Sequence, residues 1–334
     1  MIIEKMDKKI ISEEFQTTKV LYDRLGLNIV DALKTFLGEH KIDVLDIYHR
    51  VKNFTSFFEK IDRKGYKKPF DDIEDICGVR VICYYSTDVE KINKIISSEF
   101  QILEEENKAE LLGLNEFAYR SQHFIVKINK DWTAAPNYRK LKDLKAEIQV
   151  RTILMHAWAE IEHKLNYKSD AQVPDKFQRK LFRLSAKFEE ADEQFDELRS
   201  GIEEYKSQLD KKITISKKFD NSQEFNLETF KAFLKFHFPE ATWPDGRISL
   251  GFETFVKHGK PFSLLEKAVN KIKPYIKEIS DDLKKEGYES KNNESEILLW
   301  IGLDIIDQET FNRRQKLTSE NWRNVVVKWR KVIT

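Results

Sequence analysis

The chain has 334 residues, of which 40% are hydrophobic and 34% charged, and its formal net charge is +1. This length allows two domains of the usual ~100–200 residues. The near-zero net charge argues against a general nucleic-acid binder, and no apolar run reaches the ~18 residues that a membrane-spanning helix needs. The first residues lack the apolar core of a signal peptide, and Cys77 and Cys83 lie in an apolar stretch typical of buried thiols. A cytoplasmic protein is therefore expected.

Helical and strand patterns alternate through the N-terminal part of the chain. Apolar residues at helical spacing predict helices over residues 8–38 and 53–64. Residues 79–85 are apolar and β-branched enough for a buried strand, and the polar residues 86–88 cap a helix that ends near Ser97. Further strands are expected over residues 100–105, 121–128 and 145–152. Strands interleaved with helices predict a mixed sheet with helices packed on it.

The segment 146–152 carries the strongest chemical signal. In a strand, Glu147, Gln149 and Arg151 share one face. A carboxylate, an amide and a guanidinium in one row suit metal and phosphate chemistry, although alternation alone fits a solvated edge strand equally well. A predicted helix over residues 154–163 follows directly, and the first turn of a helix favours an anionic ligand. The segment is therefore predicted to form part of a site for an anionic substrate.

One long helix is predicted over residues 176–209. Its apolar residues recur in steps of three and four, as in a heptad seam. The seam consists of Leu181, Leu184, Phe188, Ala191, Phe195, Leu198, Ile202, Tyr205 and Leu209. Packing against its own domain is the favoured interpretation. The alternatives are a homo-oligomer contact or a docking surface for the C-terminal half.

A polar stretch, residues 210–223, separates two predicted domains, 1–212 and 213–334. The second domain is predicted to be mostly α-helical, with Pro274 bending one helix. Its helices are expected over residues 226–236, 262–287, 294–306 and 318–333. In the last of these, the apolar residues Trp322, Val325, Val326 and Trp329 are expected to pack on the domain. The basic residues Arg323, Lys328, Arg330 and Lys331 are then expected to project outward, where they would suit a phosphate backbone or an acidic protein partner.

Three sequence blocks occur together in the first domain. They run from Tyr48 to Arg80, from Tyr119 to His123, and from Glu147 to Lys168. In this order they resemble the synthetase domain of the RelA/SpoT family of alarmone synthetases, with the similarity ending before residues 213–334. The resemblance implies an α+β fold, a nucleotidyltransferase-like mixed β-sheet flanked by helices. It also implies a pyrophosphokinase that uses Mg²⁺ to move pyrophosphate from ATP to the 3′-hydroxyl of GDP or GTP, which makes ppGpp.

The resemblance assigns roles to individual residues. The chain has no glycine-rich phosphate loop, so phosphates must be held by side chains. In the family, the first block binds ATP, and the matching residues are Arg50, Lys52, Lys60, Arg63, Lys64 and Arg80. For all of these except Arg80, charge pattern alone would favour a solvated face. Asp75 matches a metal ligand, and Glu147 matches the residue that meets the acceptor hydroxyl, either as a base or through the metal. The acceptor side is matched by Tyr119, Arg120, His123, Gln149 and Arg151.

Departures from the family pattern leave the acceptor open. Ala118 replaces the usual glycine, and alanine does not freely adopt positive φ. No His-Asp constellation of a hydrolase precedes residue 50, so residues 213–334 become the candidate regulatory or partner-binding part. One alternative is a toxic synthetase, of the toxin–antitoxin kind, that pyrophosphorylates the 3′ end of tRNA, with residues 213–334 as a neutraliser or sensor. The other alternative is a catalytically inert nucleotide-binding regulator. The presence of Asp75, Tyr119 and Glu147 argues against it.

Overall fold

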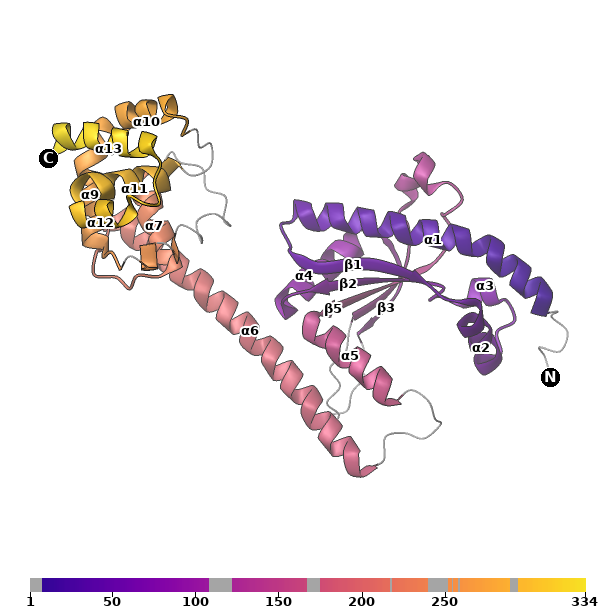
Figure 1. Cartoon of the computed structure of the whole chain (residues 1–334). Coiled ribbons are helices and arrows are strands. Elements are labelled where there is room, and N and C mark those ends of the chain that lie inside the picture. Colours follow the sequence, from indigo (N-terminus) through magenta and orange to yellow (C-terminus); the bar gives the residue numbers. More distant parts are fainter. Residues whose placement is uncertain are drawn as a thin grey trace. The chain divides into compact units, whose positions relative to one another are not determined.

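The chain folds into two compact units, Met1–Ser200 and Gly201–Thr334, each with its own buried core (Figure 1). The division falls within helix α6 (Asp175–Ser216). The structure is a computed structural model. It describes residues 8–107, 122–166, 175–216, 218–239, 252–253, 255–257, 259–288 and 294–334.

A five-stranded mixed sheet forms the centre of the first unit, which confirms the predicted mixed sheet, although its edge strand at residues 44–51 was not among the expected strands. Its strand order is β1-β2-β5-β4-β3. The strands are β1 (Val44–Val51), β2 (Cys77–Cys83), β3 (Gln101–Asn107), β4 (Gln122–Lys127) and β5 (Ala146–Thr152). Strands β2 and β5 are parallel, and the other neighbouring pairs are antiparallel. The register places Gly78 opposite Glu147 and Arg80 opposite Gln149.

Strand alternation separates a buried face of this sheet from an open one. The apolar residues Val79, Val81, Ile148 and Val150 are buried in one cluster with helices α1 (Lys8–Glu39) and α4 (Ser86–Glu99). Helix α1 lies along β1 and β2 (Figure 1). The intervening polar residues of β2 and β5 consequently point away from this core. The chemistry of the first unit is therefore concentrated on the open face.

The remaining helices of the first unit follow their local signals. Helix α2 begins after Asn53, whose side chain accepts the Ser56 N–H, and it ends at Gly65, which has a left-handed φ of 66°. Helix α5 enters directly from β5, as predicted. The bounds are α2 (Phe54–Lys64), α3 (Pro69–Asp72) and α5 (Ile153–Asn166), with the short 3-10 turns η2 (Lys130–Ala134) and η3 (Pro136–Tyr138).

The described part of the second unit is helical, which confirms the predicted class. Pro274 lies in a 3-10 turn that splits the helix expected over residues 262–287, because proline cannot donate the backbone hydrogen bond of a helix interior. Besides the end of α6, the helices are α7 (Leu227–His237), α9 (Phe262–Ile272), η4 (Lys273–Tyr275), α10 (Ile276–Lys285), α11 (Glu294–Ile306), α12 (Gln308–Arg314) and α13 (Glu320–Ile333). Helix α11 contacts α9, α12 and α13 and forms much of the second core.

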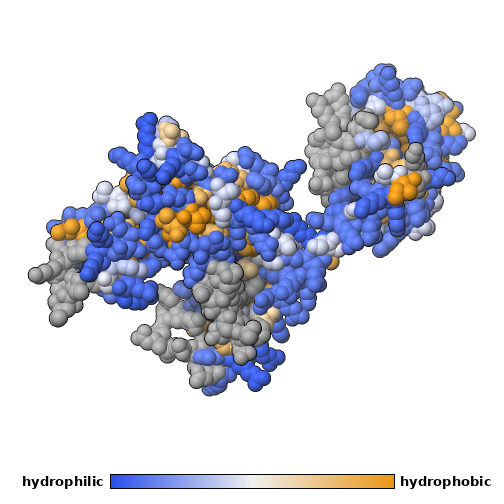
Figure 2. Space-filling view, turned by 180° about the vertical axis from the view of Figure 1, so that it is seen from behind, coloured by the Kyte–Doolittle hydropathy of each residue, from blue (hydrophilic) through white to orange (hydrophobic). Residues whose placement is uncertain are grey.

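The apolar seam of α6 packs only in part as the favoured interpretation expected. Phe195 and Leu198 are 50% and 60% exposed, and Ile202 is also exposed. The polar residues Ser185 and Asp192 are buried on this helix instead. The prediction holds in part, because the Phe188 ring lies 5.8 Å from that of buried Trp158 on α5 and Leu209 is buried, whereas hydrogen bonds hold the stretch around Asp192. Figure 2 shows a largely hydrophilic surface with separate hydrophobic patches on both units.

The basic row of the last helix is also different from the prediction. Trp322, Val325, Val326 and Trp329 are buried, as expected. Arg330, however, donates from Nε and Nη2 to the carbonyl of Asp304 at 2.9 and 2.6 Å. Arg323 donates to the carbonyls of Gln315 and Thr318. Lys328 is exposed but forms an ion pair with Asp282. These three cations satisfy groups of their own domain, so the four do not form a free outward row, although Lys331 is exposed as predicted.

Candidate functional site

A hollow of about 180 Å³ opens on the polar face of the sheet. It is lined by Tyr48, Arg50, Lys52, Asp75, Gly78, Arg80, Glu147 and Gln149. The register of three adjacent strands explains the hollow, because Gly78 lies between Arg50 on β1 and Glu147 on β5. A Cβ atom at Gly78 would meet nothing nearer than the Arg50 carbonyl at 3.9 Å. Because Gly78 has no side chain, the space between the Arg50 guanidinium and the Glu147 carboxylate stays open.

Glu147 is held on both of its carboxylate oxygens. His123 Nδ1 lies 2.7 Å from Oε1, and Gln149 Nε2 donates to Oε2 at 2.9 Å. Burial raises the pKa of Glu147, but the hydrogen bonds and charge of His123 and the hydrogen bond of Gln149 outweigh it. The net pKa is below the usual value, so the carboxylate is ionised at neutral pH. Glu147 can therefore accept a proton from a ligand that enters the hollow.

The hydrogen bonds continue along β5. Gln149 Oε1 accepts from Arg151 Nη2 at 2.9 Å, so His123, Glu147, Gln149 and Arg151 form one chain of contacts. This confirms the prediction that Glu147, Gln149 and Arg151 share a face. His123 and Arg151 are themselves buried. In this structure they orient Glu147 and Gln149, while their roles toward an acceptor stay predictions.

Asp75 lies at the lysine-rich end of the hollow. Its carboxylate forms ion pairs with Lys52 at 3.0 Å and Lys60 at 2.9 Å. Burial raises the pKa of Asp75, but the two lysines lower it by more, so the net pKa is below the usual value. The negative charge of Asp75 also raises the pKa of Glu147, which places the two carboxylates within electrostatic reach. The carboxylates and the lysines are therefore arranged around one small volume.

Two carboxylates in one hollow fit Mg²⁺, which takes one or two carboxylates and completes its shell with phosphate and water oxygens. Asp75 and Glu147 supply that number. No group of three or more metal-ligating side chains occurs in the described ranges, so an all-protein site is not formed there. Lys52 or Lys60 would have to release an oxygen of Asp75 for the metal. The donor set thus fits a cation that arrives with a phosphate substrate.

Arg80 is fixed by two partners at the other end of the hollow. Its Nη1 donates to the Tyr48 hydroxyl at 3.1 Å and to Glu160 Oε1 at 2.8 Å. Glu160 belongs to α5, so this helix helps to set the direction of the guanidinium. Sequence reasoning missed Tyr48 and Glu160 as site residues. Tyr48 could have been found from its position two residues before Arg50 on the same strand face.

The other predicted residues are more dispersed. Arg50 lines the hollow, and Lys60 reaches it through Asp75. Arg63 and Lys64 are exposed in the last turn of α2 and do not line the hollow. Tyr119 and Arg120 lie outside the described residues, as does Ala118. The structure therefore brings together the predicted metal and phosphate residues around Asp75 and Glu147, but not the end of α2.

Comparisons with known proteins concern the part of the chain that contains this hollow. A family model described as "Region found in RelA / SpoT proteins" matches residues 49–172. The chain is 32% identical over 178 residues to the GTP pyrophosphokinase YwaC of Bacillus subtilis (strain 168), covering 50% of this chain and 82% of that protein. It is 30% identical over 166 residues to YjbM of the same organism, also a GTP pyrophosphokinase, covering 49% and 75%.

Two solved structures are similar over a slightly longer range. A GTP pyrophosphokinase family protein from Streptococcus pneumoniae has 28% identity and a TM-score of 0.49, covering 57% of this chain and 96% of that one. Small alarmone synthetase 1 from Bacillus subtilis, bound to its product pppGpp, has 27% identity and a TM-score of 0.48, covering 57% and 98%.

Proposed function

This chain belongs to the RelA/SpoT family, and from that premise we propose that it transfers pyrophosphate from ATP to the 3′-hydroxyl of GDP or GTP. Relatives named GTP pyrophosphokinase support a transferase of diphosphate groups. One observation carries the proposal for this chain. An ionised Glu147 and an ion-paired Asp75 line a single hollow with Arg50, Lys52 and Arg80.

The arrangement suits attack on a phosphorus atom, which depends on positioning and charge neutralisation. Arg50, Lys52 and Lys60 would neutralise the phosphate oxygens of ATP. Arg80, held by Tyr48 and Glu160, would lie against the adenine. Glu147 would take the proton of the attacking hydroxyl, with His123 and Gln149 holding its carboxylate in place. Mg²⁺ bound through Asp75 would supply further neutralisation of the phosphates, and the alternative role of Glu147 is to meet the hydroxyl through this metal.

The proposal is tested with ATP labelled at the β and γ phosphates. The pure protein is incubated in parallel with GDP, GTP, AMP and bulk tRNA, each with and without Mg²⁺. Label on GDP or GTP is the expected result. Label on tRNA alone would show that the acceptor is the tRNA 3′ end. The basic residues of α13 do not support this alternative, because Arg330 and Arg323 bond to carbonyls of their own domain. If no acceptor receives label, the result would favour the alternative in which the protein is a catalytically inert nucleotide-binding regulator.

Asp75→Asn is expected to abolish Mg²⁺-dependent transfer while ATP still binds. The substitution removes the charge that the metal needs and keeps the size of the side chain, whereas Arg50, Lys52 and Arg80 remain. The measurement is transfer as a function of Mg²⁺ concentration, beside calorimetric binding of a non-hydrolysable ATP analogue. Asp72→Asn, which changes an exposed residue of α3, is the matched control. A normal Mg²⁺ dependence of the Asp75 variant would place the metal ligand elsewhere.

We also propose that the second unit restrains the enzyme. A chain that ends at Ser200 contains the whole first unit, including its separate core. Such a chain is expected to transfer pyrophosphate faster than the full chain, and to be more toxic to cells that express it. Initial rates at equal concentrations of the two chains provide the measurement. Equal rates, with the shorter chain folded by circular dichroism, would contradict a restraining role.

A further inference from the structure

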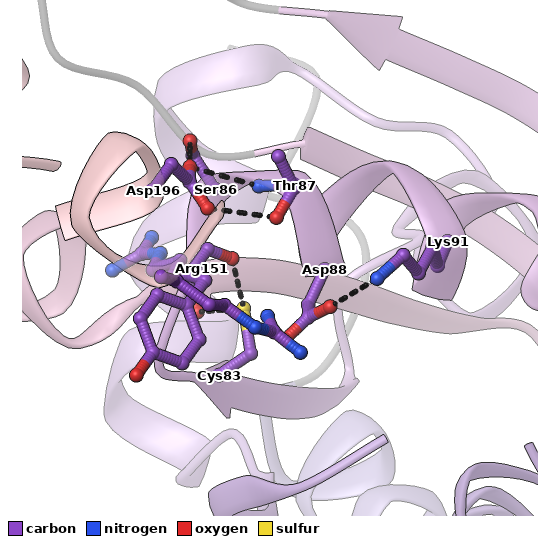
Figure 3. Close-up of polar contacts among 9 residues, drawn as sticks. Cys83, Ser86, Thr87, Asp88, Lys91, Arg151 and Asp196 are labelled. Atoms are coloured by element: carbon purple, nitrogen blue, oxygen red, sulfur yellow. Dashed lines mark hydrogen bonds and ion pairs between the residues drawn. The ribbon is translucent and has the colours of Figure 1, made fainter. Parts of the chain in front are cut away.

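The inner face of α6 is bound to the first unit by a row of polar side chains. Asp192, Asp196 and Arg199 are spaced by four and three residues, so they lie on one side of the helix. Asp196 accepts hydrogen bonds from Ser86 and from the backbone and hydroxyl of Thr87, at the start of α4 (Figure 3). These bonds replace the side-chain cap that α4 lacks. Arg199 donates to Asp88 at 2.6 Å.

Asp192 reaches a different element, the end of the strand that carries Glu147. The Thr152 hydroxyl donates to Asp192 Oδ2 at 2.6 Å, and both residues are buried, with exposures of 0% and 3%. The same hydroxyl accepts the Met155 N–H at 3.0 Å, which satisfies a donor in the first turn of α5. One hydroxyl thus joins β5, α5 and α6. Hydrogen bonds to a carboxylate are among the stronger ones in proteins.

The position of this joint connects it to the hollow in two ways. Thr152 is the last residue of β5, so it ends the strand from which Glu147, Gln149 and Arg151 project. It also begins the helix that carries Glu160, whose carboxylate is bonded to Arg80. A shift at Thr152 would move both the carboxylate end and the guanidinium end of the hollow. The neighbouring contact of the Cys83 thiol with the Arg151 carbonyl, at 3.4 Å, is much weaker (Figure 3).

We propose that Asp192 is a positioning residue for pyrophosphate transfer. Through the Thr152 hydroxyl, Asp192 fixes the junction of β5 and α5. It thereby holds Glu160 against Arg80 and sets the position of Glu147 in the hollow. The inference rests on the proposed function for the reaction that it serves. Asp192 does not line the hollow, so it would act on the site through Thr152 rather than by touching substrate.

The chemistry of the pair argues for a geometric role. Burial, and then the charge of Asp196, raise the pKa of Asp192 to about 7. A carboxylate that is costly to ionise adds little stability, and an apolar side chain in place of Asp192 could fill this space while Thr152 still caps α5 through Met155. A directional hydrogen bond is what the apolar side chain could not supply. Asp192 is therefore explained by orientation rather than by stability.

Thr152 offers a matched set of variants. Thr152→Val removes the hydroxyl, and with it both the Asp192 bond and the Met155 cap, whereas Thr152→Ser keeps both and Asp192→Leu removes only the Asp192 bond. We expect Thr152→Val to raise the KM for ATP and lower kcat, with kcat/KM for ATP reduced ~10-fold or more, because displacements near 1 Å can cost ~10² in rate. Thr152→Ser should stay within a few-fold of wild type. Ser86→Ala, which loosens α6 from α4 without touching β5, is the control for a general loosening of the helix.

Calorimetric binding of a non-hydrolysable ATP analogue is measured on the same proteins, after circular dichroism has shown that each is folded. Weaker binding by Thr152→Val and by Asp192→Leu, with normal binding by Thr152→Ser and Ser86→Ala, is the expected result, and normal binding and kinetics of Asp192→Leu would overturn the inference. Equal kinetics and equal binding for Thr152→Val and wild type would overturn the inference, as would an equal loss in Ser86→Ala. If wild type transfers no pyrophosphate, the proposed function fails, but the binding comparison still decides whether Thr152 positions Arg80. Absence of analogue binding by wild type would overturn both.

Discussion

Glu147→Gln is expected to lower the rate of pyrophosphate transfer by about 10²-fold or more, the usual contribution of a general base. The amide has the shape of the carboxylate but cannot take the proton of the attacking hydroxyl. His123 and Gln149 already hold the side chain at 2.7 and 2.9 Å, so the variant should keep its place on the open face of β5. The measurement is kcat with saturating ATP and acceptor, beside the circular dichroism spectrum of the folded protein.

The control for Glu147 is Glu104→Gln on the exposed strand β3, which should leave the rate unchanged. A Glu147→Gln rate within a few-fold of wild type would contradict the assignment. The pH dependence provides a second check. The pKa of Glu147 lies below its ordinary value of 4.5 because His123 and Gln149 outweigh burial. Glu147 therefore stays ionised as the pH falls from 7 to 5, and its protonation should cause no loss of activity in that range.

Much of the first unit could be predicted because strand alternation is a strict, local pattern. The apolar residues of β2 and β5 identify a buried face, and the same alternation places Glu147, Gln149 and Arg151 together on the other. The spacing does not reveal which strands are neighbours. The pairing of β2 with β5 puts Gly78 between Arg50 and Glu147, and this pairing creates the hollow.

The contacts that sequence reasoning missed join residues that are far apart in the chain. Glu160 meets Arg80 across 80 residues, and Asp192 meets Thr152 across 40. A polar residue in a helical pattern is usually solvated, so nothing local marks Glu160 or Asp192 as a buried or bonded partner. The apolar seam of α6 was misleading in part, because Phe188 packs on Trp158 while Phe195 and Leu198 stay exposed. Beside these exposed residues, Asp192, Asp196 and Arg199 of the same helix bond to the first unit.

Asp304→Ala is expected to destabilise the second unit by about 3–5 kcal/mol, the usual cost of removing one partner of a buried ion pair. Asp304 is fully buried, and its Oδ2 accepts from Arg314 Nη1 at 2.6 Å and from Trp322 Nε1 at 2.8 Å. The Arg314 guanidinium lies 3.9 Å from the centre of the Trp300 ring. Alanine would leave the arginine charge buried without a counter-charge and the Trp322 donor without an acceptor.

A loss of that size is a large part of the ~5–15 kcal/mol that stabilises a typical domain. Chemical denaturation, followed by tryptophan fluorescence and circular dichroism, is expected to show the second unit unfolding early. The first unit should keep its midpoint, because its core is separate. Glu309→Ala removes the exposed ion pair with Arg313 on α12 and should cost about 0–1 kcal/mol, so it controls for loss of charge alone. Equal midpoints for Asp304→Ala and Glu309→Ala would show that the buried network does not hold α11, α12 and α13 together.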